Sequence, residues 1–229
     1  MDITVFMRYF PVNLDIKHRD CLVVGGGSVG TRKTMMLHDC GAIVTVVSLY
    51  FTQQLVNISN NSTLVLKKKP FEQSDLKQRF LVVSATNDEN LNHQISTEAG
   101  KNNILCNIAD RPEVSNFILP AVVNRGDLVI GISTSGKSPA FAKHLRKKLE
   151  AEFGDEYAEF LCLMGAIRQT LLRKPHEPET HKCLFEEIIS KDIVQMIKEN
   201  RIDDINAVLF NILGIGFEFD QLVQSDKSS

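Results

Sequence analysis

Short apolar runs alternate with stretches of helical periodicity along the first half of the chain. The apolar runs are Cys21–Val24, Ile43–Val47, Thr63–Leu66, Phe80–Ser84 and Ile104–Ile108. Helical patterns fill the intervals near 29–40, 51–58 and 89–101. This alternation is typical of a parallel sheet with helices on both faces. We therefore expect an α/β domain over residues 1–113, with a further edge strand at Tyr9–Ile16, which contains a proline.

Two apolar segments separated by a polar turn with a glycine follow this domain. They are 116–123 and 128–133, and together they predict a β-hairpin. Ser138 then suits the N-cap of a helix with one apolar face. That face consists of Phe141, Leu145, Leu149 and Phe153. A hairpin and one helix bury too little apolar surface to be stable alone, so we expect residues 114–150 to form the dimerisation module of a homodimer.

Helical periodicity dominates the last third of the chain. It extends from Asp155 to about Gly216 and is broken at Pro175 and Pro178. Residues 221–229 are mostly polar and are typical of a frayed tail. We expect a helical C-terminal domain over residues 151–229.

Composition and charge narrow the classes of function. The 229 residues carry a formal net charge of −2, which gives no general attraction to nucleic acid or to an anionic membrane. No apolar run has the length of a membrane span, and the first residues lack a basic segment followed by an apolar core, so we expect a cytoplasmic protein. The five cysteines are dispersed without a C-x-x-C pair, which favours reduced thiols over disulfides or a zinc site.

The apolar run Cys21–Val24 leads directly into a glycine turn. Gly25, Gly27 and Gly30 occupy the three positions of G-x-G-x-x-G, which permit a sharp turn, close approach of backbone amides to a pyrophosphate, and tight packing of helix on strand. The helix that follows ends at Gly41, in the position of a C′ glycine. A bound pyrophosphate would therefore lie at a helix N-terminus. The order strand, turn, helix, strand favours a Rossmann-type NAD-binding fold over a purely structural turn.

The end of the second apolar run bears on cofactor choice. Ile43–Val47 is followed by Ser48, where dinucleotide-binding folds usually carry the Asp or Glu that holds the ribose hydroxyls and repels a 2′-phosphate. We therefore expect weaker discrimination against NADP than in a protein with the acidic residue.

A second glycine-rich segment matches a nucleotide motif. Residues 131–138 fit the phosphate-loop pattern G-x-x-x-x-G-K-S and lie between an expected strand and an expected helix. Phosphate-loop enzymes also need an acidic strand end that holds Mg²⁺, and no apolar strand ending in Asp follows Ser138. We interpret the segment as a turn with a helix N-cap, and a nucleotidase that binds ATP remains the alternative.

Other candidate chemistry is less specific. Asp110 ends an apolar strand just before Arg111-Pro112, where an aspartate often serves only to make a turn. His176, His181 and Cys183 lack a fourth ligand at metal-site spacing, and we expect a solvated connection and no bound metal. The basic residues around Lys143 and Lys147 suit either a solvated helix face or attraction of an anionic substrate.

Taken with the glycine turn, several further segments carry a resemblance to a known family. These are Thr86-Asn87-Asp88, Cys106-Asn107-Ile108-Ala109-Asp110 and Ser133-Thr134-Ser135-Gly136-Lys137-Ser138-Pro139. In their order from Tyr9 to Glu150 the chain resembles the precorrin-2 dehydrogenase/sirohydrochlorin ferrochelatase family, the N-terminal module of siroheme synthases. Beyond Glu150 the resemblance is weaker and mainly helical. The chain lacks the methyltransferase domain of the fused enzymes, so no methylation step is expected.

The resemblance implies a Rossmann domain, a dimerising hairpin and helix, and a helical domain that closes over a tetrapyrrole. It implies that Asp110 is the catalytic acid/base for NAD-dependent oxidation of precorrin-2 to sirohydrochlorin, with Fe²⁺ insertion as a further step. The implied cofactor contacts are Gly25, Gly27, Ser28, Val29, Gly30, Ser48, Leu49, Tyr50, Thr86 and Asn87. The implied substrate contacts are Asn107, Ser133, Thr134, Gly136 and Ser138. The family has a serine pair whose second member is Thr134 here, so a regulatory role tied to serine is in doubt.

A rival interpretation comes from another class of protein. A regulatory domain that senses NAD(H) without catalysis would use the glycine turn but would have no use for Asp110 or the hairpin. Binding of NAD without its reduction would favour that rival.

Overall fold

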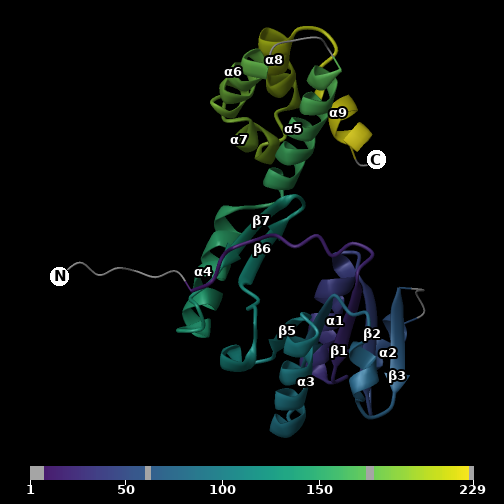
Figure 1. The fold of residues 1–229 in the computed structure, drawn as a ribbon. Helices are drawn as coiled ribbons and strands as arrows, with labels where there is room; N and C mark the ends of the chain where they lie inside the picture. The colour runs from purple at the N-terminus through teal and green to yellow at the C-terminus, as the bar shows by residue number, and fades with distance from the viewer. Residues whose placement is uncertain (1–7, 60–62, 174–177, 227–229) are drawn as a thin grey trace, which may run out of the picture. The chain divides into compact units, whose positions relative to one another are not determined.

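A computed structural model describes residues 8–59, 63–173 and 178–226. The chain forms two compact units, one ending at Leu119 and the other beginning at Pro120 (Figure 1). Within the described segments, no helix combines the length and apolar character that crossing a bilayer requires.

The first unit is built on a parallel sheet in the order β3-β2-β1-β4-β5. The strands are β1 (Asp20–Val24), β2 (Ile43–Ser48), β3 (Leu64–Lys68), β4 (Leu81–Ser84) and β5 (Leu105–Ile108). In register, Val24 pairs with Val47 on one side and with Ser84 on the other. The strand order reverses between β1 and β4, and in open parallel sheets ligands bind outside the carboxyl ends of the strands at such a point.

Helices cover both faces of this sheet, as the alternation of patterns predicts. They are α1 (Ser28–Asp39), α2 (Gln53–Ile58) and α3 (Glu89–Lys101), with short 3₁₀ helices η1 (Gln73–Leu76) and η2 (Pro112–Val114). Leu37 and Leu55 pack with the strands on one face, while Ile95 and Ala99 do so on the other. Gly41 follows α1 with φ +78°, the left-handed conformation expected of a C′ glycine.

The expected strand at Tyr9–Ile16 is wrong. These residues form no strand, and Phe10, Val12 and Leu14 are exposed. Alternation alone does not make a strand, because a strand also needs a partner for its backbone groups, and Pro11 has no N–H to offer. Of this segment only Ile16 reaches the core.

The second unit opens with a β-hairpin and a helix, as predicted. Strands β6 (Ala121–Arg125) and β7 (Leu128–Ile132) pair antiparallel, and Gly126, with φ +62°, begins the turn. The first strand therefore begins at Ala121, later than the expected position 116. Helix α4 (Pro139–Glu152) packs on both strands, and the Ser138 hydroxyl caps it by accepting the Phe141 amide at 3.2 Å.

A helical bundle completes the second unit. Its helices are α5 (Glu156–Leu172), α6 (Pro178–Ile189), α7 (Ile193–Lys198), α8 (Ile202–Leu213) and α9 (Phe219–Asp226). Pro178 begins α6, whereas Pro175 lies outside the described residues. The expected frayed tail is wrong for most of its length: α9 reaches Asp226, and Leu222 and Val223 are buried in the bundle core with Leu163 and Leu209.

Candidate functional site

The glycine turn sits where β1, β4 and α1 meet. Gly25 has φ +110°, and a Cβ there would lie 2.5 Å from the Ala85 carbonyl oxygen. A Cβ on Gly30 would lie 1.9 Å from the Gly25 carbonyl oxygen. Both approaches are impossible for a side chain, because the obstructing atoms are backbone. The first and third glycines are therefore required by packing, as the motif predicts.

The N-terminus of α1 is suited to an anion. Gly27 is its N-cap, no side chain of the described residues caps it, and its first turn carries no acidic residue. The first amide of α1 with a carbonyl partner in the helix is that of Thr31, which donates to Gly27 at 2.8 Å. The preceding amides are thus available to a pyrophosphate. These features fit the NAD that the sequence predicts.

The segment after β2 lies against the glycine turn. The Thr52 amide donates to the Gly26 carbonyl at 3.0 Å, and a Cβ on Gly26 would lie 2.2 Å from the Tyr50 carbonyl. The side chains of Leu49 and Tyr50 are 64% and 66% exposed, so they remain available to a ligand. Ser48 ends β2, and its hydroxyl accepts the Tyr50 amide at 3.4 Å. The structure thus brings Ser48, Leu49 and Tyr50 together with the predicted glycines.

A polar pocket of about 230 Å³ opens beside the glycine turn at the ends of β4 and β5. Its lining residues are Val29, Ala85, Thr86, Asn87, Glu89, Asn92, Ala109, Asp110 and Arg111. Whole-ligand pockets usually occupy about 300–1,000 Å³, so this pocket suits one part of a larger ligand. It joins four of the residues predicted from the sequence: Val29, Thr86, Asn87 and Asp110.

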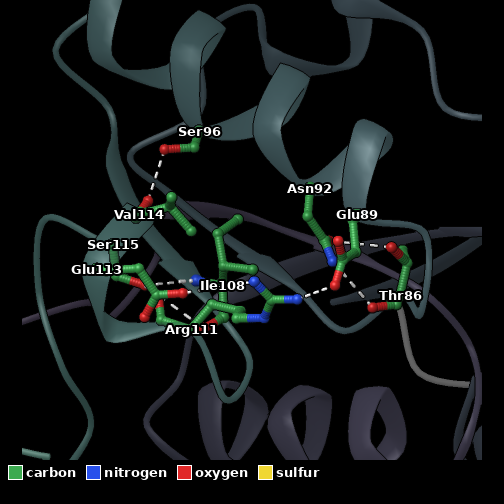
Figure 2. Close-up of polar contacts among 9 residues, drawn as sticks. All are labelled: Thr86, Glu89, Asn92, Ser96, Ile108, Arg111, Glu113, Val114 and Ser115. Atoms are coloured by element: carbon green, nitrogen blue, oxygen red, sulfur yellow. Dashed lines mark hydrogen bonds and ion pairs between the residues drawn. The ribbon is translucent and has the colours of Figure 1, made fainter.

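Asn92 fixes one wall of this pocket and was missed by the sequence analysis. Its side-chain oxygen accepts the Ser84 hydroxyl at 2.6 Å. The same oxygen accepts the Thr86 hydroxyl at 3.0 Å, and the side-chain amide donates to the Thr86 carbonyl at 3.0 Å (Figure 2). Asn92 is 8% exposed. An isolated Asn in a polar helix gives no sequence signal, because its role arises only when α3 packs over the end of β4.

Asp110 lies in a hydrogen-bonded turn after β5. It has φ +62°, a left-handed conformation that Asp and Asn tolerate better than most residues. The Arg111 amide donates to the Ile108 carbonyl, and the Ser115 hydroxyl accepts the Ile108 amide at 2.9 Å and donates to the Arg111 carbonyl at 2.8 Å. These bonds close the loop behind Asp110, whose side chain is exposed at the pocket.

Charged and amide side chains brace the same loop. Arg111 pairs with Glu89 at the start of α3 and with Glu113 at 3.6 Å (Figure 2). Asn116 takes the place of a further strand beside β5, since its side-chain oxygen accepts the Cys106 amide at 2.7 Å and its amide donates to Ile104 at 3.0 Å. The loop that carries Asp110 is thus held at both ends.

Asn107 does not line this pocket. It is 8% exposed, and its side-chain amide donates to the Phe117 carbonyl at 3.0 Å. In this structure Asn107 therefore holds the chain beside β5, and its predicted contact with a substrate stays a prediction.

The predicted residues Ser133, Thr134, Gly136 and Ser138 form one loop of the second unit. Ser135 and Gly136 have φ of +53° and +81°, and the Lys137 amide donates to the Thr134 carbonyl, which is a type I′ turn. The Ser133 and Thr134 hydroxyls accept the amides of Ser135 and Ser138 at 3.1 and 3.2 Å. Three amides of the loop, those of Ser135, Lys137 and Ser138, are therefore used internally. The loop also follows a strand of an antiparallel pair, unlike a phosphate-binding loop in a parallel sheet.

The last candidates from the sequence are the histidines of the C-terminal half and the basic face of α4. Within the described residues, no group of three His, Cys, Asp or Glu side chains is placed to hold a metal; His176 lies outside them. On α4, Lys143, Lys147 and Lys148 are exposed, and Arg146 pairs with Glu150 on its own helix. The exposed lysines fit a solvated helix face, and they are equally open to an anionic substrate, so both interpretations from the sequence stand.

Comparison with known proteins places these features in a family. Residues 12–121 match a family model described as "Putative NAD(P)-binding", and residues 125–152 match one described as "Sirohaem biosynthesis protein central". The chain is 34% identical to a siroheme synthase of Vesicomyosocius okutanii over 203 residues, which are 89% of this chain and 44% of that protein. It is 35% identical to a siroheme synthase of Salmonella dublin over 162 residues, 71% of this chain and 35% of that protein.

A solved structure matches over nearly the whole chain. The precorrin-2 dehydrogenase SirC has a TM-score of 0.70 and 27% sequence identity, with 96% of this chain and 100% of that chain covered. By contrast, the chain spans less than half the length of the siroheme synthases, at 44% of the first one. The chain thus belongs to the precorrin-2 dehydrogenase/sirohydrochlorin ferrochelatase family, which includes the N-terminal part of siroheme synthases.

Proposed function

We propose that this protein is an NAD-dependent precorrin-2 dehydrogenase that forms sirohydrochlorin. The observation that carries the proposal is that one pocket is lined both by Val29, from the turn that suits a dinucleotide, and by the exposed carboxylate of Asp110. A cofactor site and a proton acceptor therefore meet in unit one. The likeness to SirC and to siroheme synthases supports this choice of substrate.

The cofactor is held mainly by backbone groups. We assign the pyrophosphate to the amides of Gly27, Ser28 and Val29 at the start of α1, and the adenosine to the exposed segment Ser48–Tyr50. Thr86, which is hydrogen-bonded to Asn92, and its neighbour Asn87 also line the pocket. NAD⁺ accepts a hydride from the substrate when bound.

Asp110 acts on the proton that accompanies this hydride. Oxidation of precorrin-2 by NAD⁺ yields sirohydrochlorin, NADH and one proton, so the macrocycle must lose a proton as well as a hydride. A carboxylate oxygen of Asp110 takes that proton, and the closed loop behind it fixes its position. Exposure lets the proton pass on to water.

The loop of the second unit contacts the tetrapyrrole in this proposal. The Ser133 and Thr134 hydroxyls accept backbone amides, which leaves each hydroxyl hydrogen to donate to a substrate carboxylate. The positive φ of Ser135 and Gly136 fixes the turn that presents them. A serine is not required for this contact, since Thr134 keeps the hydroxyl.

Insertion of Fe²⁺ into sirohydrochlorin is proposed as a second reaction at the same carboxylate. Metal insertion releases two pyrrole N–H protons, and Asp110 offers an exposed acceptor for them. Here the iron is a substrate and needs no resident protein ligands. The free cysteines support a reducing, cytoplasmic setting for both reactions.

We also propose that the hairpin and α4, within the module 114–150, form a homodimer interface. Val123 is fully buried in the hairpin, whereas Val129 and Phe141 are 50% and 53% exposed. This apolar surface is covered if two copies pair.

Light scattering at micromolar concentration should give a dimer, and Val129→Lys should shift it to monomer by placing a charge in the interface. A monomeric parent protein would contradict the proposal.

The activity is tested by mixing the protein with enzymatically made precorrin-2 and NAD⁺. NADH absorbance and the macrocycle spectrum should change together, and addition of Fe²⁺ should convert the product to siroheme. NAD binding without NADH formation would instead support a regulatory NAD(H) sensor. ATP binding by the loop at 131–138 would support the nucleotidase.

A further inference from the structure

Lys33 is a partly buried cation without a partner. It lies in the second turn of α1. No hydrogen bond or ion pair reaches its ammonium group from the residues that the structure describes. Arg111, the cation that lines the pocket, is by contrast paired with Glu89 and Glu113. Unlike Arg111, Lys33 thus has no ion-pair partner among the described residues, and its charge feels only the through-space attraction of Asp110.

The contacts of α1 show which side of the helix Lys33 occupies. The Thr31 hydroxyl bonds to that of Thr52 at 2.7 Å, and the His38 ring bonds to Thr63 at 3.2 Å. These partners belong to the segments before α2 and β3, so this side of α1 faces the β3 end of the sheet. Lys33 is two positions from Thr31, which places it on the opposite side of the helix, toward β4 and β5.

That side of α1 leads to the pocket. Val29 is one turn before Lys33 and lines the pocket together with Asp110. Long helical side chains extend toward the helix N-terminus, so the Lys33 stem runs in the direction of Val29. On β5, Leu105 packs on the α1 face of the sheet, and by alternation Asn107 belongs to the same face.

The charge of Lys33 is poorly compensated. Burial lowers the pKa of the Lys33 ammonium below its usual range, repulsion from Arg32 lowers it further, and only attraction from Asp110 opposes these effects. Lys33 and Asp110 thus interact through space without forming an ion pair. A partly dehydrated cation gains more from an anionic ligand than a fully solvated one, because little hydration remains to be lost.

We propose that Lys33 binds a carboxylate of the tetrapyrrole and thereby positions the macrocycle beside Asp110. This inference rests on the proposed function, which supplies a substrate rimmed with carboxylates. Lys33 does not exchange protons in the reaction; it is a positioning residue, whose ammonium donates to a substrate oxygen. The same interaction serves sirohydrochlorin, which keeps the carboxylates of precorrin-2.

Three variants test the inference. Lys33→Met keeps the length and apolar stem and removes the charge, and Lys33→Arg restores the charge. Arg32→Met removes an exposed charge from the same helix and controls for net charge. The dissociation constant of sirohydrochlorin is measured by absorbance titration without NAD, so that this readout does not depend on turnover, and thermal unfolding checks that each variant is folded.

We expect Lys33→Met to weaken sirohydrochlorin binding by about 10- to 100-fold, as for loss of one hydrogen bond between charged groups. KM for precorrin-2 should rise similarly while the dissociation constant of NAD⁺ stays unchanged. Lys33→Arg should recover most of the affinity, and Arg32→Met should change it less than about threefold.

Two outcomes overturn the inference alone. If Lys33→Met binds sirohydrochlorin as the parent does, Lys33 does not hold the substrate. If Lys33→Met instead weakens NAD⁺ binding, the ammonium serves a cofactor phosphate. A folded parent protein that binds no sirohydrochlorin and oxidises no precorrin-2 would overturn the proposed function itself, and this inference with it.

Discussion

Asp110 combines a left-handed backbone with an exposed carboxylate, which decides how its role is tested. Asn tolerates φ +62° and keeps the shape, whereas Ala would add about 1–2 kcal/mol of backbone strain. Asp110→Asn should therefore leave folding and NAD binding intact and lower the dehydrogenase rate by about 10²–10⁴-fold. Steady-state kinetics with precorrin-2 measure this loss, and a rate equal to the parent's removes Asp110 from the mechanism.

Substitution of two helical glycines by alanine should change the free energy of unfolding in opposite directions. A Cβ on Gly30 would meet the Gly25 carbonyl, whereas a Cβ on Gly100, inside α3, meets nothing within 4 Å. Gly30→Ala should lower the free energy of unfolding by about 1–3 kcal/mol and abolish NAD binding. Gly100→Ala should raise that free energy by about 0.5–1 kcal/mol without affecting the cofactor. Denaturant unfolding and NAD titration measure both variants; normal NAD binding by Gly30→Ala would contradict the proposed pyrophosphate site.

At the scale of elements, the register of β2 and β3 bears on cofactor choice. Ser48 pairs with Lys68, so a cation neighbours the position where other dinucleotide-binding folds place an acid. Turnover should therefore favour NAD over NADP by less than about a thousandfold, some 4 kcal/mol.

Two variants separate the contributions of this pair. Ser48→Asp should raise the preference for NAD, because its carboxylate repels a 2′-phosphate, and Lys68→Met should weaken use of NADP alone. The measurement is kcat/KM for each cofactor with precorrin-2. A parent preference well above a thousandfold, unchanged in Ser48→Asp, would assign the choice to another residue.

Helices and strands are also joined by side chains that hydrogen-bond to backbone groups, where a neighbouring strand would otherwise do so. Arg125 on β6 donates to the carbonyls of Phe153 and Glu150 at 2.8 and 2.9 Å and so binds the hairpin to the end of α4. At the free edge of β5, the side-chain oxygens of Asn116 and Ser115 instead accept the backbone amides of Cys106 and Ile108. Such contacts have no periodicity, which explains why the sequence predicts the strands but not the residues that hold their edges.

At the scale of the whole molecule, two buried thiols make the free energy of unfolding depend on pH in the alkaline range. Burial, with a smaller contribution from Asp20, raises the pKa of Cys21 to about 11, and burial alone raises that of Cys106 to about 11. The folded state thus keeps these protons where the unfolded chain, with a pKa near 9, loses them. Stability from this source is complete below about pH 9 and declines toward pH 11.

The free energy of unfolding should accordingly fall as pH rises through this window. Denaturant unfolding at several pH values measures the slope, and Cys21→Ala with Cys106→Ala should flatten it while lowering stability at neutral pH. A slope unaffected by the double variant would show that other groups cause the decline.

The sequence by itself predicts the parallel sheet, the glycine turn, the hairpin and the N-cap at Ser138. These features depend on residues close together in the sequence. Periodicity decides which side of a helix or strand faces the core, and Gly25 and Gly30 are required by the turn that follows β1. The same locality explains two errors. Alternation at Tyr9–Ile16 lacked a partner strand, and the polar pattern after Gln221 concealed Leu222 and Val223.

Only the tertiary structure decided what lies around Asp110. Asn92, Ser115 and Lys33 approach the site from different elements, so no spacing along the chain relates them to it. The left-handed conformation of Asp110 likewise belongs to a loop that is closed by Ser115, a residue five positions further along the chain. The sequence determines which segments form and which of their faces are apolar, because those are local properties. The partners of a polar side chain depend on which segments meet, because hydrogen bonds and charges act over a few ångströms in space.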